Sequence, residues 1–378
     1  MTPQSIWEKI NPPAGRGVFV VAEAGKNFIE TEEDQPVAVY LENAERLARL
    51  AKDAGADAIK FQTHDVEDEI LNIPFVSPHF PDSKSGDRHS WISRSTKATP
   101  VNEFWQPLKK YCDEIGIIFF STPMSRGAAK RLEEVQTPIW KIGSGDILDF
   151  PLLDFVSQTG KPILLSSGMS TLEELEQAIG FLKKRTEKVA LLHCVSKYPC
   201  PKEDLNLKTI EFFREQYNLP IGFSDHSLDI ESALLAVSLG ATILEKHFSL
   251  SRTLWGPDHK VSLTPEELKL LVREVHLFEN NPIRQEEILK RDFAQSCLGS
   301  PAKVLQADEE AFRPLFRKSL MAGCDLPAGT MITAQMVYAM RPQALANGLP
   351  SERYESVLGR KCKRALKKYE PLTEEILA

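Results

Sequence analysis

Short apolar runs that end in polar residues recur along most of the chain. The first run, residues 18–22, breaks into the polar, glycine-bearing loop of residues 23–27. Residues 40–54 then carry apolar side chains at helical spacing and stop at Gly55, a suitable cap for the end of a helix. Because a continuous apolar run of this length is typical of a strand buried on both faces, the pattern predicts a parallel strand followed by a covering helix.

The same unit recurs until about residue 278. The later predicted strands are also apolar runs with polar ends, at residues 56–62, 117–123, 139–144, 162–168, 189–194, 219–224 and 241–245. Helical patterns follow them, and those that begin at Thr171 and Thr264 have hydroxyl and carboxylate capping signals. About eight strand and helix pairs in roughly 260 residues predict a (β/α)8 TIM barrel. An open doubly wound sheet is the alternative, although it usually has fewer strands and no Gly-x-Gly-x-x-Gly follows the first strand.

Two stretches interrupt this rhythm. Between Gln62 and Asn102 the chain is rich in Pro, Ser, Asp and His without a helical period, as expected for a lid or binding loop. Residues 280–316 are mixed and charged, and we expect a linker there. From Arg317 onward, short apolar runs and turns predict a small β-rich unit with little core of its own. We therefore expect an N-terminal segment (1–16), a catalytic TIM barrel (17–279), a linker (280–316) and a small β-rich domain (317–378).

The composition is that of a soluble globular protein. Hydrophobic residues make up 42% and charged residues 26% of 378 residues, with a formal net charge of −7. The acidic balance argues against nucleic-acid binding, although a local basic cluster could still bind a small anion. Neither a signal-peptide pattern nor an apolar run of about 20 residues occurs, so we expect a cytoplasmic protein without membrane contact. The six cysteines form no Cys-x-x-Cys pair, which favours reduced thiols.

Polar residues collect at the ends of the predicted strands. In a barrel the carboxyl ends of all strands share one rim, where active sites lie. The residues expected there are Glu23, Asn27, Lys60, Gln62, Ser121, Thr122, Lys141, Ser144, Asp146, Ser166, Ser167, Ser196, Tyr198, Ser224, Asp225, His226, Glu245 and His247. Two lysines, a ring of hydroxyls and the backbone amides near Gly143 suit a phosphorylated anion. Each residue alone is more often an ordinary rim residue, but together they favour a binding site.

Two histidines, His226 and His247, end the last two predicted strands. If these strands are neighbours, the imidazoles meet at one rim, where a pair of them near carboxylates is a candidate site for a divalent metal ion. Two unrelated loop histidines are the alternative. Asp258, in the turn after the last strand, is a candidate to complete a metal shell or to hold substrate hydroxyls, or it is an ordinary turn residue.

An ordered series of motifs follows the strands. It comprises Ala22-Glu23-Ala24-Gly25-Lys26-Asn27, Lys60-Phe61-Gln62, Phe120-Ser121-Thr122-Pro123, Lys141-Ile142-Gly143-Ser144-Gly145-Asp146, Ser166-Ser167-Gly168-Met169, Leu192-His193-Cys194, Tyr198-Pro199, Gly222-Phe223-Ser224-Asp225-His226, Leu244-Glu245-Lys246-His247 and Gly256-Pro257-Asp258. This series resembles the sialic acid synthase family, the bacterial nonulosonate synthases. The C-terminal unit, with Arg317-Lys318-Ser319 and Arg341-Pro342, resembles the antifreeze-like (SAF) domain of that family. The resemblance runs from about Gly17 to the C-terminus.

The resemblance implies a transferase that condenses phosphoenolpyruvate with the open-chain aldehyde of an N-acylated hexosamine, releasing phosphate and forming a nine-carbon nonulosonic acid. It implies a divalent ion, Mn²⁺ with Mg²⁺ or Co²⁺ as alternatives, on His226 and His247, which would polarise the aldehyde. The positions implied to hold phosphoenolpyruvate are Lys60, Thr122, Lys141, Ser144, Ser166, Ser196 and Ser224. Those implied to face the sugar are Glu23, Gln62, Tyr198 and Asp258, and Glu23 or Asp146 is implied as the proton carrier.

The family resemblance also implies a domain-swapped homodimer, in which Arg341 matches an arginine that the small domain places over the partner subunit's sugar site. Several positions depart from the family pattern: Lys26 replaces an apolar residue, Phe28 a histidine and Ser196 an asparagine, and the loop of residues 341–348 is longer. Because these changes lie mainly on the sugar side, the sugar stays open between N-acetylmannosamine, its 6-phosphate and a diacetamido-trideoxyhexose. A metal-dependent pyruvate aldolase and a non-catalytic sugar- or phosphate-binding protein are the alternative functions.

Overall fold

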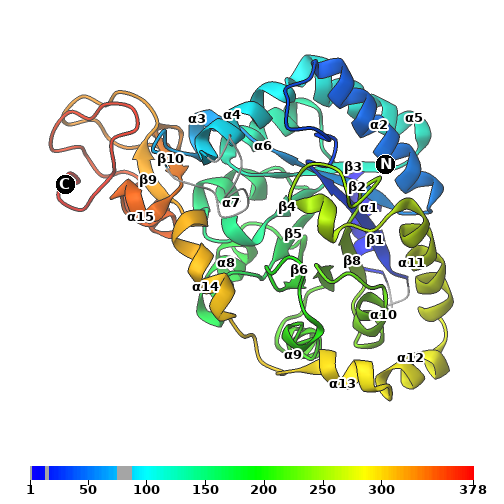
Figure 1. Ribbon diagram of the computed structural model, residues 1–378. Coiled ribbons are helices and arrows are strands. Elements are labelled where there is room, and N and C mark those ends of the chain that lie inside the picture. Colours follow the sequence, from blue (N-terminus) through cyan, green and yellow to red (C-terminus); the bar gives the residue numbers. More distant parts are fainter. Residues whose placement is uncertain (1, 13–16, 75–86) are drawn as a thin grey trace.

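The barrel predicted from the sequence is confirmed by a computed structural model, which describes residues 2–12, 17–74 and 87–378 (Figure 1). Eight parallel strands close into a ring in chain order, with β8 paired to β1. The closed ring excludes the open doubly wound sheet. The strands are β1 (Phe19–Gly25), β2 (Ala58–Thr63), β3 (Ile118–Pro123), β4 (Trp140–Ile142), β5 (Ile163–Ser166), β6 (Val189–Cys194), β7 (Ile221–Asp225) and β8 (Ile243–His247).

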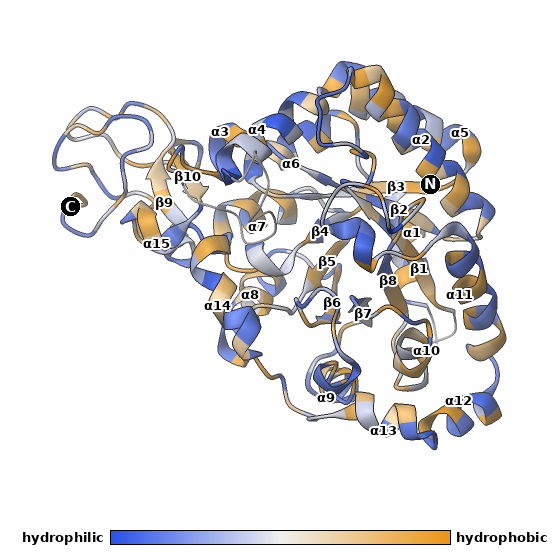
Figure 2. Cartoon of the chain, in the orientation of Figure 1, coloured by the Kyte–Doolittle hydropathy of each residue, from blue (hydrophilic) through white to orange (hydrophobic). Residues whose placement is uncertain are grey.

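One helix layer surrounds the ring, and its members bury an apolar stripe while exposing a polar one (Figure 2). In α2 the buried residues Tyr40, Ala44, Leu47 and Ala51 recur at helical spacing. Both predicted capping boxes are present, at Thr171 and Thr264. The covering helices are α2 (Val37–Asp53), α5 (Gln106–Ile115), α6 (Arg126–Glu134), α7 (Phe150–Ser157), α8 (Leu172–Lys183), α9 (Thr209–Gln216), α10 (Glu231–Ser238) and α11 (Pro265–Phe278).

The amino-terminal end of the barrel is plugged by apolar side chains. Helix α1 (Pro3–Ile10) buries Ile6 and Ile10 completely. They join one cluster with residues from the barrel strands, among them Phe19, Phe120 and Leu192. Inward-facing side chains near the amino-terminal ends of the strands thus form a packed apolar core. The carboxyl-terminal ends remain available for polar residues.

The interruption after β2 differs from the expectation. Residues 88–98 form helix α4 (Arg88–Ala98), and a single helical turn, α3 (Val66–Glu69), precedes it. The prediction of a loop without helix was therefore wrong for these residues. Helix α4 buries Ser95 along with Trp91 and Ile92, and this mixed stripe conceals the period in the sequence. Of the prolines and the glycine that marked the loop, Pro78, Pro81 and Gly86 lie outside the described residues.

The segment 280–316, expected to be a linker, consists largely of three short helices. They are α12 (Pro282–Leu289), α13 (Asp292–Leu298) and α14 (Ala307–Phe316). Ile288, Ala294 and Cys297 are buried, so the segment packs on the molecule instead of merely joining its parts. Each helix has ten residues or fewer, which is too short to show a clear periodic pattern in a charged stretch.

The C-terminal unit is β-rich, as predicted, and lies beside the barrel at the left of Figure 1. Strands β9 (Ser319–Ala322) and β10 (Val337–Met340) pair antiparallel, and isolated bridges such as Leu326 to Leu366 tie the remaining loops. Its helices are α15 (Gln343–Ala346) and α16 (Tyr354–Val357). The unit also contains the short turns η6 (Ala334–Met336) and η7 (Ser351–Arg353), and those of the barrel part are η2 (Val101–Trp105), η3 (Ser144–Asp146), η4 (Lys202–Asp204) and η5 (Asp258–Val261).

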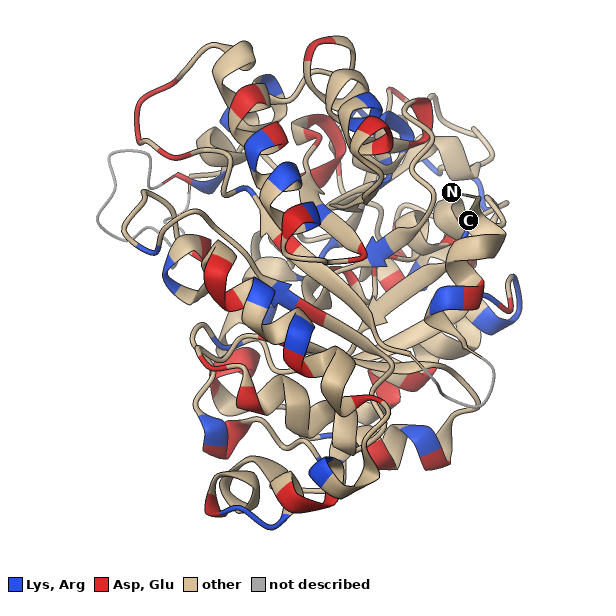
Figure 3. Ribbon diagram, turned by 90° about the vertical axis from the view of Figure 1, so that its right-hand side faces the viewer, with Lys and Arg blue, Asp and Glu red and all other residues tan. Residues whose placement is uncertain are grey.

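Charged residues of both signs are interspersed over the outer helices (Figure 3). All six cysteines are free thiols, in agreement with the expectation from their spacing. Across residues 2–12, 17–74 and 87–378, none of the helices combines the length and the apolar character needed to cross a membrane.

Candidate active site

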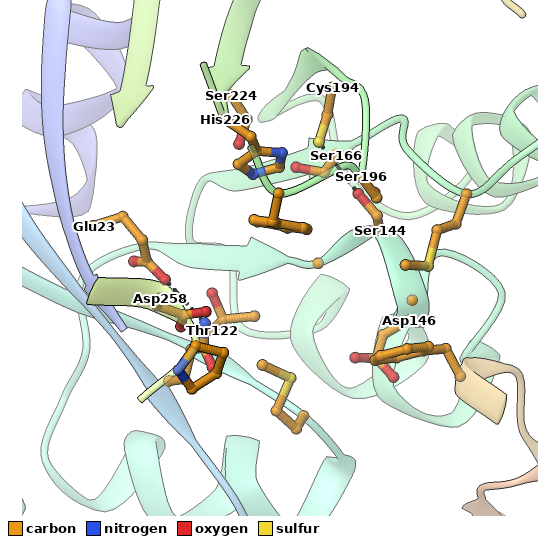
Figure 4. Close-up of a pocket in the computed structure, with 18 of the residues that line it drawn as sticks. Glu23, Thr122, Ser144, Asp146, Ser166, Cys194, Ser196, Ser224, His226 and Asp258 are labelled. Atoms are coloured by element: carbon orange, nitrogen blue, oxygen red, sulfur yellow. Dashed lines mark hydrogen bonds between the residues drawn. The ribbon is translucent and has the colours of Figure 1, made fainter. Parts of the chain in front are cut away.

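A cavity of about 750 Å³ opens at the carboxyl ends of the barrel strands. The residues proposed from the sequence for catalysis, substrate binding and metal binding all line it. They are Glu23, Lys60, Gln62, Thr122, Lys141, Ser144, Asp146, Ser166, Ser196, Tyr198, Ser224, His226, His247, Asp258 and Arg341. In Figure 4, Ser144, Ser166 and Ser196 lie together across the cavity from Glu23. The structure therefore brings together side chains that are separated by more than three hundred residues in the chain.

The alternation of strand side chains selects which rim residues face the cavity. Ser224 and His226 lie two residues apart at the end of β7 and both line the cavity, as do Glu245 and His247 on β8. Asp225 points the other way and forms a buried ion pair with Lys246, at 2.6 Å. Asp225 was expected among the rim residues, but it stabilises the strand pair outside the cavity.

Two lysines and two glutamates form a buried network in the cavity floor. Lys60 Nζ lies 2.8 Å from Glu23 Oε2 and 3.6 Å from Glu245 Oε2, and Lys141 Nζ lies 3.5 Å from Glu245 Oε1. Lys60 also donates to Thr122 Oγ1 at 2.9 Å, and Lys141 to Ser166 Oγ at 2.6 Å. The strand register explains the proximity, because Glu23 pairs with Lys60 across β1 and β2.

Burial and neighbouring charges act differently on these four groups. Burial raises the pKa of Glu23, although Lys60 opposes the shift. Burial would also raise the pKa of Glu245, but Lys141 and Lys60 outweigh it and hold that pKa below the usual range. Burial lowers the pKa of Lys141 despite Glu245. Glu23 is thus the carboxylate of the pair that takes up a proton more readily.

Hydroxyl groups form a cradle around Gly168. A Cβ atom at this position would lie 2.3 Å from Ser196 Oγ and 2.5 Å from Ser144 Oγ, so only glycine lets the two hydroxyls approach. Ser196 Oγ is buried and has no hydrogen-bond partner among the described residues. Because buried polar groups are nearly always hydrogen-bonded in native proteins, this hydroxyl is a candidate donor to a ligand.

The two histidines meet as expected, with ring centroids 5.5 Å apart, and the Tyr198 ring lies 4.0 Å from that of His226. Burial lowers the pKa of His226 to about 3, and the neighbouring His247 acts in the same direction, so this imidazole is neutral. His226 Nδ1 lies 2.7 Å from the Val195 carbonyl oxygen, to which a neutral ring donates, leaving Nε2 as a ligand atom. His247 Nδ1 is buried without a hydrogen-bond partner among the described residues.

These features fit a divalent metal ion held by two protein ligands. No group of three or more His, Cys, Asp or Glu residues in the described part of the chain is arranged to hold a metal. An ion held by His226 and His247 would leave positions for water or substrate oxygen atoms, as catalytic metal sites do.

Asp146 lies at the other side of the cavity, within a buried cluster that joins the small domain to the barrel. Lys318 Nζ lies 2.9 Å from Asp146 Oδ1 and 2.6 Å from Asp149 Oδ2, and Arg341 forms an ion pair with Asp146. The Arg341 amide donates a hydrogen bond to the Glu69 carbonyl oxygen, and the Arg341 carbonyl oxygen accepts one from the Leu71 amide, each at 2.9 Å. Within this chain Arg341 lines the cavity, and its expected place over a partner subunit's site stays a prediction.

Helix α14 connects the barrel to the small domain within this chain. Glu309 is fully buried and accepts hydrogen bonds from the backbone amides of Met169 and Ser196, both at 2.8 Å. Phe316, at the end of the helix, packs against Gly145 and lines the cavity. The helix therefore delivers the small domain to the rim of the same barrel.

Some cavity residues were missed as site residues. Glu245 was noted only as a rim residue, although its spacing of two from His247 places both on the same face of β8. Lys26, recognised only as a departure from the family pattern, and Arg88 also line the cavity. For Arg88 and Phe316 the sequence has no local signal, because each reaches the cavity through a long-range contact.

Comparisons with known proteins agree with the fold and with the family that the motifs resemble. Residues 47–284 match the NeuB family, and residues 317–378 match the SAF domain. The chain is 32% identical to human N-acetylneuraminate-9-phosphate synthase over 95% of this chain and 92% of that protein. It is also 32% identical to N,N'-diacetyllegionaminic acid synthase of Campylobacter jejuni over 94% of this chain and 99% of that protein.

Two solved structures share the arrangement of the whole chain or most of it. The spore coat polysaccharide biosynthesis protein SpsE of Bacillus subtilis superposes with a TM-score of 0.73 and 28% identity, covering 96% of this chain and 95% of that one. The N-acetylneuraminic acid synthetase of Leptospira borgpetersenii, in complex with citrate, gives a TM-score of 0.60 and 33% identity, covering 79% and 90%.

Proposed function

Because the chain belongs to the NeuB family, we propose that it is a phosphoenolpyruvate-dependent synthase of a nonulosonic acid. The second substrate is the open-chain aldehyde of an N-acylated hexosamine. The methylene carbon of phosphoenolpyruvate bonds to the aldehyde carbon, water supplies the new keto oxygen, and phosphate leaves. The products are a nine-carbon 2-keto acid and inorganic phosphate.

The observation that carries this proposal is the pairing of two buried lysines with a hydroxyl cradle. Lys60 and Lys141 supply positive charge, while Thr122, Ser144, Ser166, Ser196 and Ser224 supply directed hydrogen-bond donors. A phosphorylated carboxylic acid needs both, because its two anionic groups each accept several hydrogen bonds. The lysines donate to hydroxyls as well as to carboxylates, so their positions are set before the ligand arrives.

Glu23 is the better of the two proposed proton carriers. Its raised pKa suits proton exchange with the aldehyde oxygen, and Gln62 Nε2 donates to Glu23 Oε1 at 3.2 Å and orients it. Asp146 is held between Lys318 and Arg341, which suits a structural task. Tyr198 and Asp258 line the cavity and would contact the sugar.

His226 and His247 would hold the divalent ion, Mn²⁺ or alternatively Mg²⁺ or Co²⁺. When bound, such an ion supplies Lewis-acid polarisation of the aldehyde. His226 is fixed for this task by its bond to the Val195 carbonyl oxygen.

The test is mass spectrometry of the products from phosphoenolpyruvate, Mn²⁺ and a panel of amino-sugar aldoses, with phosphate release measured in parallel. We expect a nine-carbon acid and phosphate only when both aldose and metal are present. Lys141→Met should abolish turnover, whereas Lys184→Met, on the exposed surface, should not change it. Product formation from pyruvate without phosphate release would instead establish an aldolase, and undiminished turnover after chelation would refute the metal.

A further inference from the structure

Two cations in the cavity, Lys26 and Arg88, have no ion-pair partner among the described residues. Arg88 is only 9% exposed, and its Nε atom is buried without a hydrogen-bond partner among those residues. Its guanidinium group lies 4.6 Å from the centroid of the Phe316 ring. Lys26 Nζ lies 4.8 Å from the centroid of the Trp91 ring. Aromatic faces rather than carboxylates thus support both charges.

These cations belong to a charge group distinct from the lysine network in the cavity floor. The charges that act on Lys26 are those of Asp258, Arg88, Glu69 and Arg341. The charges that act on Lys60 are those of Glu23 and Glu245. Lys26 and Lys60 therefore have different charged neighbours, and the proposed binding of phosphoenolpyruvate uses Lys60 and Lys141 without Lys26 or Arg88.

Two acids that act on these cations, Asp146 and Glu69, already have other partners. Asp146 pairs with Lys318 and Arg341, and Glu69 Oε2 lies 2.7 Å from His64 Nδ1. Asp258 raises the pKa of Lys26, but burial outweighs this effect. Burial lowers the pKa of Lys26 to about 8 and that of Arg88 to about 10, with Arg341 acting in the same direction. The free protein thus holds two cations at an electrostatic cost that an anionic ligand would offset.

We propose that the aldose substrate carries a phosphate monoester, which Lys26 and Arg88 bind. This inference rests on the proposed function and specifies its sugar. A phosphate monoester carries nearly two negative charges at neutral pH and therefore matches two cations, whereas a carboxylate matches one. The planar guanidinium can bind two phosphate oxygens at once, and the lysine adds a point charge.

The experiment compares N-acetylmannosamine 6-phosphate with N-acetylmannosamine as substrates, following phosphoenolpyruvate consumption. We expect kcat/KM to be about 100-fold higher for the phosphorylated sugar, since removing a group that a buried charged site recognises is costly. The double variant Lys26→Met/Arg88→Met should reduce this ratio by at least about 10-fold, mainly through KM. Lys26→Arg should retain most of the preference, and Lys269→Met, on the exposed face of α11, should retain all of it.

A binding measurement separates this inference from the proposed function. The melting temperature is recorded with each sugar in the absence of phosphoenolpyruvate. If no aldose is turned over but the phosphorylated sugar alone stabilises the wild type and not the double variant, the reaction is wrong and the phosphate site stands. Equal or better use of the unphosphorylated sugar, or a preference that the double variant keeps, overturns the phosphate site.

Discussion

Replacing Lys318 by methionine should destabilise the protein through a buried charge cluster. Lys318 is 2% exposed and bridges Asp146 and Asp149, at 2.9 and 2.6 Å. Asp146 retains Arg341 as a partner, but Asp149 loses its cation and keeps only its cap on the Leu152 amide. Burial already raises the pKa of Asp149, against the effect of Lys318, so the carboxylate would remain buried without compensation.

The expected loss in the free energy of unfolding follows from the cost of leaving one member of a buried ion pair without its partner. Removing a partner from such a pair costs about 3–5 kcal/mol. With an unfolding entropy of about 2.1 cal/mol/K per residue, a chain of 378 residues that unfolds as one unit would lose about 4–6 °C in melting temperature.

Differential scanning calorimetry at pH 7 measures this shift. Lys184→Met is the control, because Lys184 is an exposed lysine at the end of α8. Adding Asp149→Asn to Lys318→Met should recover part of the loss, since asparagine can keep the helix cap without a charge. A Lys318→Met protein that melts within 1 °C of wild type would refute the buried cluster as the joint between small domain and barrel.

Three further predictions test other parts of the molecule. Mixing inactive Arg341→Ala with inactive His247→Ala should restore no activity if Arg341 serves its own chain, whereas a domain-swapped homodimer would recover about a quarter of wild-type turnover. Burial lowers the pKa of His193 to about 4, while the unfolded chain protonates near 6.5, so the free energy of unfolding should fall by about 3 kcal/mol as pH drops from 6.5 to 4. Urea unfolding across this range should show a shallower pH dependence for His193→Phe, and an unchanged slope would contradict the assignment. Glu309→Ala leaves the Ser196 amide buried without its acceptor and should lower kcat/KM for phosphoenolpyruvate about 10-fold, with Glu309→Gln intermediate; equal kinetics would show that α14 does not position the cradle.

Much of the active site was predictable because a parallel barrel converts sequence position into spatial position. Each strand ends at the same rim, so the positions of Lys60, Lys141 and His247 at the ends of apolar runs predicted that they lie close together. The alternation of side chains along each strand determined which of the rim residues face the cavity. It turned Asp225 away from the cavity and brought Glu245, noted only as a rim residue, into the lysine network.

The parts outside the repeating units were predicted less well. Helix α4 and the helices of residues 280–316 are short or carry mixed buried faces, so no period identified them. Their stability comes from packing against the barrel, which a local pattern does not contain.

The sequence by itself determined the barrel, the small β-rich domain and the polar rim, because each depends on local period and on residue types at strand ends. Only the tertiary structure decided that Arg341 pairs with Asp146 at the cavity and that Lys26 and Arg88 lie there without a carboxylate partner among the described residues. Those outcomes depend on contacts between residues far apart in the chain, whose geometry is set by packing and not by neighbours in sequence.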